Sequence, residues 1–377
     1  MTPASHKVLQ EAEIVMGAAR HLSLLPKLDA ELVTWPVPFA DGIVQLLALR
    51  GKNVVALASG DPFWYGAGSV LARDLGHHEW QSITGPPTFS LAAAQMGWPL
   101  EDTLCLGLHA APLSRLRPHL ANGLRAIVLL RDGDAVAQLN AYLNTEGFGK
   151  STLTVMEALG GPRQRVTQFD DISEPIQHPV CVALEVNGDG SVLSYASGQS
   201  DALFAHDGQI TKRPIRALTL SALAPKFGEH LWDLGAGSGS IAIEWLLSHP
   251  SVHATAVEAH PERAARVAQN SLALGVDRLQ VVTGKSLDVL ADLPAPNVVF
   301  VGGGLDQTLL DALWAIMPVG CRFVTNAVTL ESETIVAQGH AAKGGELMRI
   351  EIANSKPLGS KRGWYSAYPI VQWSVTR

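Results

Sequence analysis

The sequence has 377 residues, of which 47% are hydrophobic and 17% are charged, and its formal net charge is −7. This length predicts two or three domains, because a single hydrophobic core rarely grows so large. The composition excludes a disordered chain, and the acidic balance argues against nucleic acid as the main partner, because binding to phosphates needs a basic surface.

Strand-like and helix-like segments alternate through the first half of the chain. Buried strands are predicted at four apolar runs, which cover residues 54–58, 126–130, 152–156 and 180–186. Helices are predicted between them at residues 69–75, 89–96 and 134–143. This alternation predicts an α/β fold in which helices cover mostly parallel sheets.

A change of composition separates this half from the second. Residues 187–191 and 197–200 are rich in glycine and serine, as is typical of a connection between domains. We therefore predict one domain over residues 1–190 and another over residues 205–377. The strands of the second domain are predicted at 231–234, 254–258, 279–282, 298–301 and 322–325. The tail from 345 to 373 is expected to close the sheet as an antiparallel hairpin.

The cysteines indicate a reducing compartment. Cys105, Cys181 and Cys321 lie far apart and form no CxxC pair, which predicts neither a disulfide framework nor a cysteine zinc site. His77 and His78 are adjacent and cannot both face one metal comfortably, and His206, His253 and His260 are dispersed, so we expect no metal. The first residues lack the apolar core of a signal peptide, and no apolar run is long enough to span a membrane. We expect a cytoplasmic protein with no membrane partner.

A glycine-rich loop follows the first strand of the second domain and opens onto a predicted helix at 241–247. Its residues are Asp233, Leu234, Gly235, Ala236, Gly237, Ser238 and Gly239. Glycines let a backbone turn tightly and approach a ligand. A dinucleotide-binding loop has the pattern G-x-G-x-x-G, whereas this chain has Ser240 in place of the third glycine.

The acid before the loop indicates which ligand it binds. Asp233 would repel a pyrophosphate but attract the ammonium and sulfonium groups of S-adenosylmethionine (SAM). Glu258 ends the next strand, about 20 residues after the loop, where an acid usually accepts hydrogen bonds from ribose hydroxyls. Gly284 and Gly302 follow the third and fourth strands, beside the expected adenine and methyl positions. The pattern favours SAM, with a NAD-dependent oxidoreductase as the competing interpretation.

Two turns of the first domain carry weaker signals. Residues 59–62 read Ser-Gly-Asp-Pro after a buried strand, and residues 85–90 lead into the next helix. Each residue type is common in turns for local reasons, so these residues alone predict an α/β domain with a cleft.

Together these segments resemble two known families. The stretches 59–62 and 86–94 are similar to the tetrapyrrole (corrin/porphyrin) methylases. The stretch 206–213, the glycine loop, residues 302–304 and residues 326–331 resemble the decarboxylating precorrin methyltransferases. The resemblance covers nearly the whole chain. It implies a tetrapyrrole methylase fold of two α/β subdomains followed by a class I Rossmann-like methyltransferase domain.

The resemblance also implies the chemistry. The first domain would methylate C5 of a precorrin in cobalamin biosynthesis. The second domain would methylate C15 and remove carbon dioxide from the C12 acetate, so that precorrin-6B becomes precorrin-8 at the expense of two SAM molecules. No catalytic residue can be named, because methyl transfer to an electron-rich macrocycle mainly needs positioning.

Site residues follow from the resemblance and from charge. The expected SAM contacts of the second domain are Thr211, Asp233, Gly235, Ala236, Gly237, Ser238, Gly239, Glu258, Gly284 and Gly302. Asp61 and Ser90 are the softer candidates in the first domain. The anionic tetrapyrrole needs cations, for which the candidates are Lys212, Arg213 and Arg216. These three could equally be solvated charges flanking a helix.

One departure from the family pattern concerns the N-terminus. Tetrapyrrole methylases begin with a strand and a glycine-rich loop, whereas residues 2–5 of this chain read as the start of the helix after that loop. Residues 13–17 then resemble the second strand. We expect the natural chain to begin upstream of Met1; the alternative is a first domain that has lost its SAM site.

Other functions stay open on the sequence alone. A class I methyltransferase acting on RNA or another small molecule would share the glycine loop, although the basic stripe expected for RNA is absent. A non-catalytic scaffold would keep the fold without the reaction. Related C-terminal domains are tetrameric, so a homo-oligomer is expected, built through the second domain.

Overall fold

In the computed structural model, residues 2–377 are described, and they divide into two compact units. Unit 1 comprises the chain up to Ala110 and residues 122–189, and unit 2 comprises residues 111–121 and 190–377. The segment 111–121 packs with unit 2, where the Arg115 guanidinium pairs with the Asp277 carboxylate at 2.8 Å. The predicted α/β fold class is confirmed, because helices and strands alternate in both units.

Unit 1 begins with a small parallel sheet in the order β2-β1-β3. The central strand is β1 (Ile14–Gly17), and all four of its residues are buried. It lies in the middle because an uninterrupted apolar run suits a strand that is covered on both faces. The other elements of this part are α1 (Pro3–Gln10), α2 (Ala19–Leu22), β2 (Glu31–Thr34), α3 (Phe39–Ala48), β3 (Val54–Ala56) and α4 (Gly68–Leu71).

The second sheet of unit 1 differs from the prediction. Its order is β4-β5-β8-β6-β7, and every pair in it except β4 with β5 is antiparallel, so the prediction of a mostly parallel sheet is wrong here. An apolar run indicates burial but not the direction of the neighbouring strand. Its elements are α5 (Thr88–Met96), β4 (Leu104–Gly107), β5 (Arg125–Leu130), α6 (Asp134–Thr145), β6 (Thr152–Glu157), β7 (Arg165–Gln168) and β8 (Val180–Glu185).

Unit 2 contains a seven-stranded sheet in the order β11-β10-β9-β12-β13-β17-β14. The five strands from β11 to β13 are parallel, and β17 is antiparallel to both of its neighbours. The strands are β9 (His230–Leu234), β10 (His253–Glu258), β11 (Gln280–Thr283), β12 (Val298–Val301), β13 (Arg322–Ala327), β14 (Glu346–Ile350) and β17 (Ile370–Thr376).

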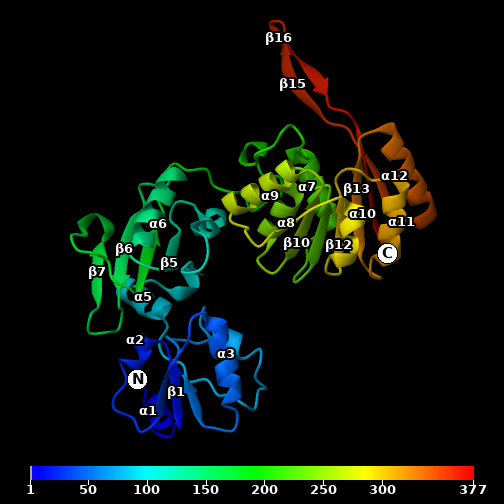
Figure 1. Ribbon diagram of the computed structural model, residues 1–377. Coiled ribbons are helices and arrows are strands. Elements are labelled where there is room, and N and C mark those ends of the chain that lie inside the picture. The colour runs from blue at the N-terminus through cyan, green and yellow to red at the C-terminus, as the bar shows by residue number, and fades with distance from the viewer. Residues whose placement is uncertain (1) are drawn as a thin grey trace. The chain divides into compact units, whose positions relative to one another are not determined.

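Helices cover both faces of this sheet (Figure 1). Successive residues of β9 point to opposite faces, so Leu231 packs in the core formed with α8, whereas Trp232 packs in the core formed with α11. Each face carries a large cluster of buried apolar side chains, which fixes the sheet between two helical layers. The helices are α7 (Arg213–Leu223), α8 (Ser240–Ser248), α9 (Pro261–Ala273), α10 (Ser286–Val289), α11 (Gln307–Ile316) and α12 (Leu330–Lys343).

The C-terminal tail forms more than the expected hairpin. Strands β14 and β17 close the sheet as an antiparallel pair, and a two-stranded ribbon of β15 (Ala353–Leu358) and β16 (Lys361–Ser366) is inserted between them. The ribbon extends away from the rest of unit 2 (Figure 1). Across residues 2–377, no helix has both the length and the apolar character that a bilayer span needs.

Candidate functional site

The carboxyl ends of the parallel strands of unit 2 bring the predicted cofactor residues together. The strand order reverses between β9 and β12, and open α/β sheets bind ligands at such a reversal. The Gly235 amide donates to the Val257 carbonyl at 2.9 Å, and the Gly302 amide donates to the Leu234 carbonyl at 2.9 Å. The loops that follow β9 and β12 are thereby tied to neighbouring strands at one edge.

The glycine loop needs glycine for reasons of space and of backbone conformation. Gly235 has φ +71°, and a Cβ there would lie 2.7 Å from the carbonyl oxygen of Gly303. Gly239 has φ +74° and precedes the first residue of α8, where a Cβ would lie 2.6 Å from Val267 Cγ1. At Gly235 the loop can therefore pass close to the β12 loop, and at Gly239 it can turn into α8, only because neither residue has a side chain.

Asp233 places a carboxyl group inside the domain at the base of this loop. The residue is 1% exposed, and its Oδ2 accepts a hydrogen bond from the Ala242 amide at 3.1 Å. Within residues 2–377 its Oδ1 has no hydrogen-bond partner. Burial raises the pKa of Asp233 to about 7, and the nearby charge of Glu258 acts in the same direction. A buried carboxyl oxygen without a partner suits a cationic ligand.

Glu258 has a structural role that the sequence did not reveal. It is 4% exposed, its Oε2 accepts from the Gly237 amide at 2.8 Å, and its Oε1 accepts from the His260 amide at 3.0 Å. Its backbone carbonyl also accepts from the Gly284 amide at 3.0 Å. The carboxylate thus holds the glycine loop in place, and each oxygen keeps a further lone pair for a ribose hydroxyl.

A segment before α7, residues 205–211, lies against the glycine loop, and we call it the strap. The Asn270 side chain accepts from the Ala205 amide at 2.9 Å and donates to the carbonyls of Ala205 and Ser238, at 3.0 and 2.9 Å. A Cβ on Gly237 would lie 3.6 Å from the Gln209 carbonyl oxygen. The strap is therefore one wall of the site, and it ends at Thr211.

An ion-pair cluster fixes the outer side of the strap. The Asp207 carboxylate pairs with Arg263 at 2.8 Å and with Arg266 at 3.2 Å, and the hydrogen bond from Arg263 lowers the pKa of Asp207. Sequence reasoning missed Asn270, Arg263 and Asp207. Asn270 is 65 residues from Ala205, and no local pattern links positions so far apart.

The three predicted substrate cations separate in the structure. Lys212 and Arg213 are exposed at the start of α7. Arg216 is 0% exposed: its guanidinium pairs with Glu244 and with Asp201 at 3.1 Å, and it donates to the Thr211 and Gln199 carbonyls. A substrate-binding role for Arg216 does not fit this placement, because its donors are taken by groups inside unit 2.

The two candidate segments of the first domain meet within unit 1. The Gly85 amide donates to the Gly60 carbonyl at 3.0 Å, which joins the loop of Asp61 to the loop that leads to Ser90. Asp61 Oδ1 accepts from the Phe63 amide at 2.8 Å, so this carboxylate shapes its own turn. Ser90 is half-buried within α5.

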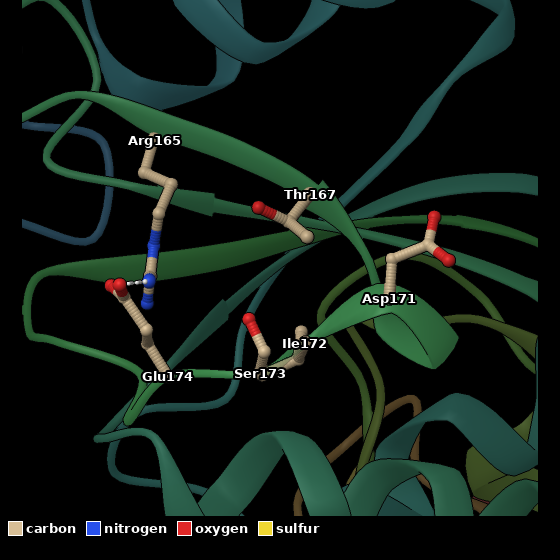
Figure 2. A pocket seen from close by; sticks show the side chains of 6 residues that line it. All are labelled: Arg165, Thr167, Asp171, Ile172, Ser173 and Glu174. Atoms are coloured by element: carbon tan, nitrogen blue, oxygen red, sulfur yellow. Dashed lines mark hydrogen bonds and ion pairs between the residues drawn. The ribbon is translucent and has the colours of Figure 1, made fainter.

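Two small cavities lie away from these loops. Figure 2 shows one of about 220 Å³ in unit 1, lined by Arg165, Thr167, Asp171, Ile172, Ser173 and Glu174. Its Arg165 is held by Glu157 and by Glu174 at 2.8 Å, which is a structural ion pair. The other, of about 250 Å³, includes His230 and His253 at the amino ends of β9 and β10, opposite the glycine loop. Neither cavity coincides with the candidate SAM site.

Comparison with known proteins covers both halves of the chain. Residues 202–377 match the family described as "Precorrin methyltransferase domain", and residues 1–171 match "Tetrapyrrole (Corrin/Porphyrin) Methylases". A protein of Sinorhizobium sp. named precorrin-6Y C(5,15)-methyltransferase [decarboxylating] is 45% identical over 98% of this chain and 92% of its own length. One of the same name from Mycobacterium tuberculosis is 40% identical over 99% and 95%.

A solved structure is similar to one half of the chain. It is the C-terminal domain of precorrin-6Y C5,15-methyltransferase from Rhodobacter capsulatus, which is 49% identical. The alignment covers 49% of this chain and 100% of that one, with a TM-score of 0.48.

Proposed function

The chain belongs to the family of decarboxylating precorrin-6Y C5,15-methyltransferases, and from this premise we propose that it methylates precorrin-6B at C5 and C15. Carbon dioxide is removed from the C12 acetate, and the product is precorrin-8 of cobalamin biosynthesis. The chain is thus a methyltransferase. This membership replaces the NAD-dependent, RNA-directed and scaffold alternatives that the sequence left open.

The proposed methyl donor is SAM, and the residues of unit 2 fit it. The observation that carries the proposal is the meeting of the glycine loop, the unpartnered Oδ1 of Asp233 and the Glu258 carboxylate at one edge of the sheet. Asp233 would face the amino group of SAM, and Glu258 would accept from the ribose hydroxyls. Gly284 and Gly302 would border the adenine and the methyl group, and the strap would close the outer side at Thr211.

The chain's own contribution to the reaction is positioning and charge. SAM, when bound, supplies a methyl group on a positively charged sulfur. The macrocycle would approach the methyl group in line beside the β12 loop, where a Cβ on Gly303 or Gly304 would meet no atom within 4 Å, and such positioning can supply much of the rate of a methyl transfer. The exposed cations Lys212 and Arg213 would hold carboxylates of the precorrin beside the loop.

The two reactions are proposed to divide between the domains. Residues 205–377 carry C15 methylation and decarboxylation, and residues 1–190 carry C5 methylation, with Asp61 and Ser90 beside a second SAM. A full-length Gly235→Ala variant tests the division. Incubated with precorrin-6B and SAM, it should release no carbon dioxide and add no methyl group at C15, as measured by product mass. Undiminished carbon dioxide release by this variant would refute the assignment.

A homo-oligomer is proposed through the ribbon of unit 2. Leu358, Trp364 and Tyr365 on the ribbon are 70%, 79% and 59% exposed. An isolated two-stranded ribbon is at best marginally stable in water, and large exposed apolar side chains on it indicate a surface that a partner shields from solvent. A second copy of the chain would shield these side chains, because the free edges of the ribbon can pair with the same strands of another chain.

A further inference from the structure

A guanidinium and an imidazole from neighbouring residues of unit 1 converge on one hydroxyl group. The Arg20 Nη2 donates to Ser59 Oγ at 3.1 Å, and His21 Nε2 lies 2.9 Å from the same oxygen. Arg20 and His21 belong to α2, which follows the carboxyl end of β1, whereas Ser59 follows the carboxyl end of β3. Because β1 and β3 are parallel neighbours, the three side chains meet at the edge where such sheets bind ligands.

The Arg20 guanidinium carries its charge without a carboxylate. Among residues 2–377, no acid lies within ion-pair distance of it, whereas Arg50 of the same unit pairs with Glu79 at 2.7 Å. Asp61 follows Ser59 closely, but its Oδ1 accepts from the Phe63 amide. Ser59 therefore orients Arg20 without neutralising it.

Arg20 carries the positive charge of this group, and the imidazoles beside it are shifted towards their neutral forms. Partial burial lowers the pKa of Arg20, and both burial and the Arg20 charge lower the pKa of His21. Burial lowers the pKa of His178, and the Arg20 charge lowers it further, whereas the Asp132 charge raises it. Asp132 itself pairs with Arg131 at 2.8 Å. The His21 Nδ1 atom is buried with no hydrogen-bond partner in the described chain. An oriented and partly buried guanidinium that has no carboxylate partner attracts an anion.

We propose that Arg20, oriented by Ser59, binds a carboxylate group of a ligand at the carboxyl edge of the first sheet. A guanidinium forms two parallel hydrogen bonds with a carboxylate, which an ammonium group cannot reproduce. The proposal rests on the proposed function for its ligand, because both the precorrin and the methionine part of SAM carry carboxylates. It gives unit 1 an anion-binding residue outside the Lys212 and Arg213 pair of unit 2.

The test compares full-length variants in two binding titrations. The probes are S-adenosylhomocysteine, followed by calorimetry, and uroporphyrin, a porphyrin with carboxylate side chains, followed by fluorescence. Arg20→Ala should weaken binding of one probe roughly tenfold, since a hydrogen bond to a charged group contributes about 1.5–3 kcal/mol. Arg20→Lys should recover part of the loss, and Ser59→Ala should lose part of the affinity. Arg50→Ala is the matched control and should bind both probes normally.

The outcomes separate the sources of the carboxylate. Weaker uroporphyrin binding assigns the site to the substrate, and weaker S-adenosylhomocysteine binding assigns it to the cofactor. If Arg20→Ala binds both probes as the unchanged chain does, the site does not exist. Carbon dioxide release by unit 2 is measured on the same variants. Its absence in the unchanged chain would count against the proposed function, whereas the titrations still decide the role of Arg20.

Discussion

Asp233 lowers the folding stability of unit 2 and at the same time provides a site for a cationic ligand. Its carboxyl group is buried with one oxygen unpartnered, and its pKa rises from 3.8 to about 7. Between these pH values the unfolded chain releases this proton while the folded chain retains it. The free protein therefore loses stability as pH rises from 3.8 to about 7, and a cationic ligand can recover that energy by favouring the ionised form.

Asp233→Asn should remove a pH dependence of cofactor binding. In the unchanged chain, affinity for S-adenosylhomocysteine should rise as pH increases through about 7, because ionised Asp233 attracts the amino group of the ligand. The variant should bind roughly tenfold more weakly at pH 8, which corresponds to about 1.4 kcal/mol. Calorimetry at pH 6, 7 and 8 measures this. Asp311→Asn, at an exposed position of the same unit, is the control. An unchanged pH dependence in Asp233→Asn would contradict the assignment.

Gly235→Ala should destabilise the protein and abolish cofactor binding. A left-handed backbone costs a residue with a Cβ about 1–2 kcal/mol, and the new Cβ would lie 2.7 Å from the Gly303 oxygen. Gly303→Ala is the comparison, because a Cβ there has open space and the backbone is not left-handed. Thermal denaturation should show a lower Tm for Gly235→Ala alone. Equal Tm values for the two variants would show that the loop relaxes around the added methyl group.

At the scale of elements, the strap depends on distant residues for its position. Arg216 holds its end at Thr211 from inside the domain, and Glu244 accepts from the Gly198 and Gln199 amides, so a single buried ion pair connects α7, α8 and the segment before the strap. Removing one partner of such a pair leaves an uncompensated buried charge. Arg216 is thus a positioning residue for the site wall.

Asn270→Ala should loosen the strap. It removes three hydrogen bonds to the backbone of Ala205 and Ser238, and unsatisfied buried groups cost about 1–3 kcal/mol. Amide hydrogen exchange should accelerate over residues 205–211, and the affinity for S-adenosylhomocysteine should fall several-fold. Ser271→Ala is the matched control, since within residues 2–377 this hydroxyl bonds to the Ala268 carbonyl of its own helix and to no strap residue. Unchanged exchange in the strap would mean that the Asp207 ion pairs suffice to hold it.

At the scale of the whole molecule, assembly depends on the ribbon. Trp364→Ser should reduce the mass of the particle in light scattering without changing its secondary structure, because the ribbon lies outside both cores of unit 2. Tyr195→Ser, which removes a 99% exposed ring from the same unit, should leave the mass unchanged. A monomeric unchanged chain, or a variant of equal mass, would refute assembly through the ribbon.

What the sequence determined by itself was local. A strand, a glycine loop, a helix and an acid stand within 28 residues, from Leu231 to Glu258, and their order alone restricts the backbone and the ligand. The α/β class followed equally from the alternation of apolar runs, and the family followed from short segments spread over the chain.

Only the tertiary structure decided what depends on distant partners. No periodicity of the sequence predicts three of these features. They are the antiparallel pairing of β6 with β8, the inclusion of residues 111–121 in unit 2 and the hydrogen bonds from Asn270 to the strap. Arg216 shows the reason most clearly. Beside Lys212 and Arg213 the sequence suggests a third surface cation. In the structure Arg216 is buried, because it forms an ion pair with the Glu244 carboxylate 28 residues away. A charged side chain can be buried only where an opposite charge lies beside it, and the packing of helices and strands determines which residue that is.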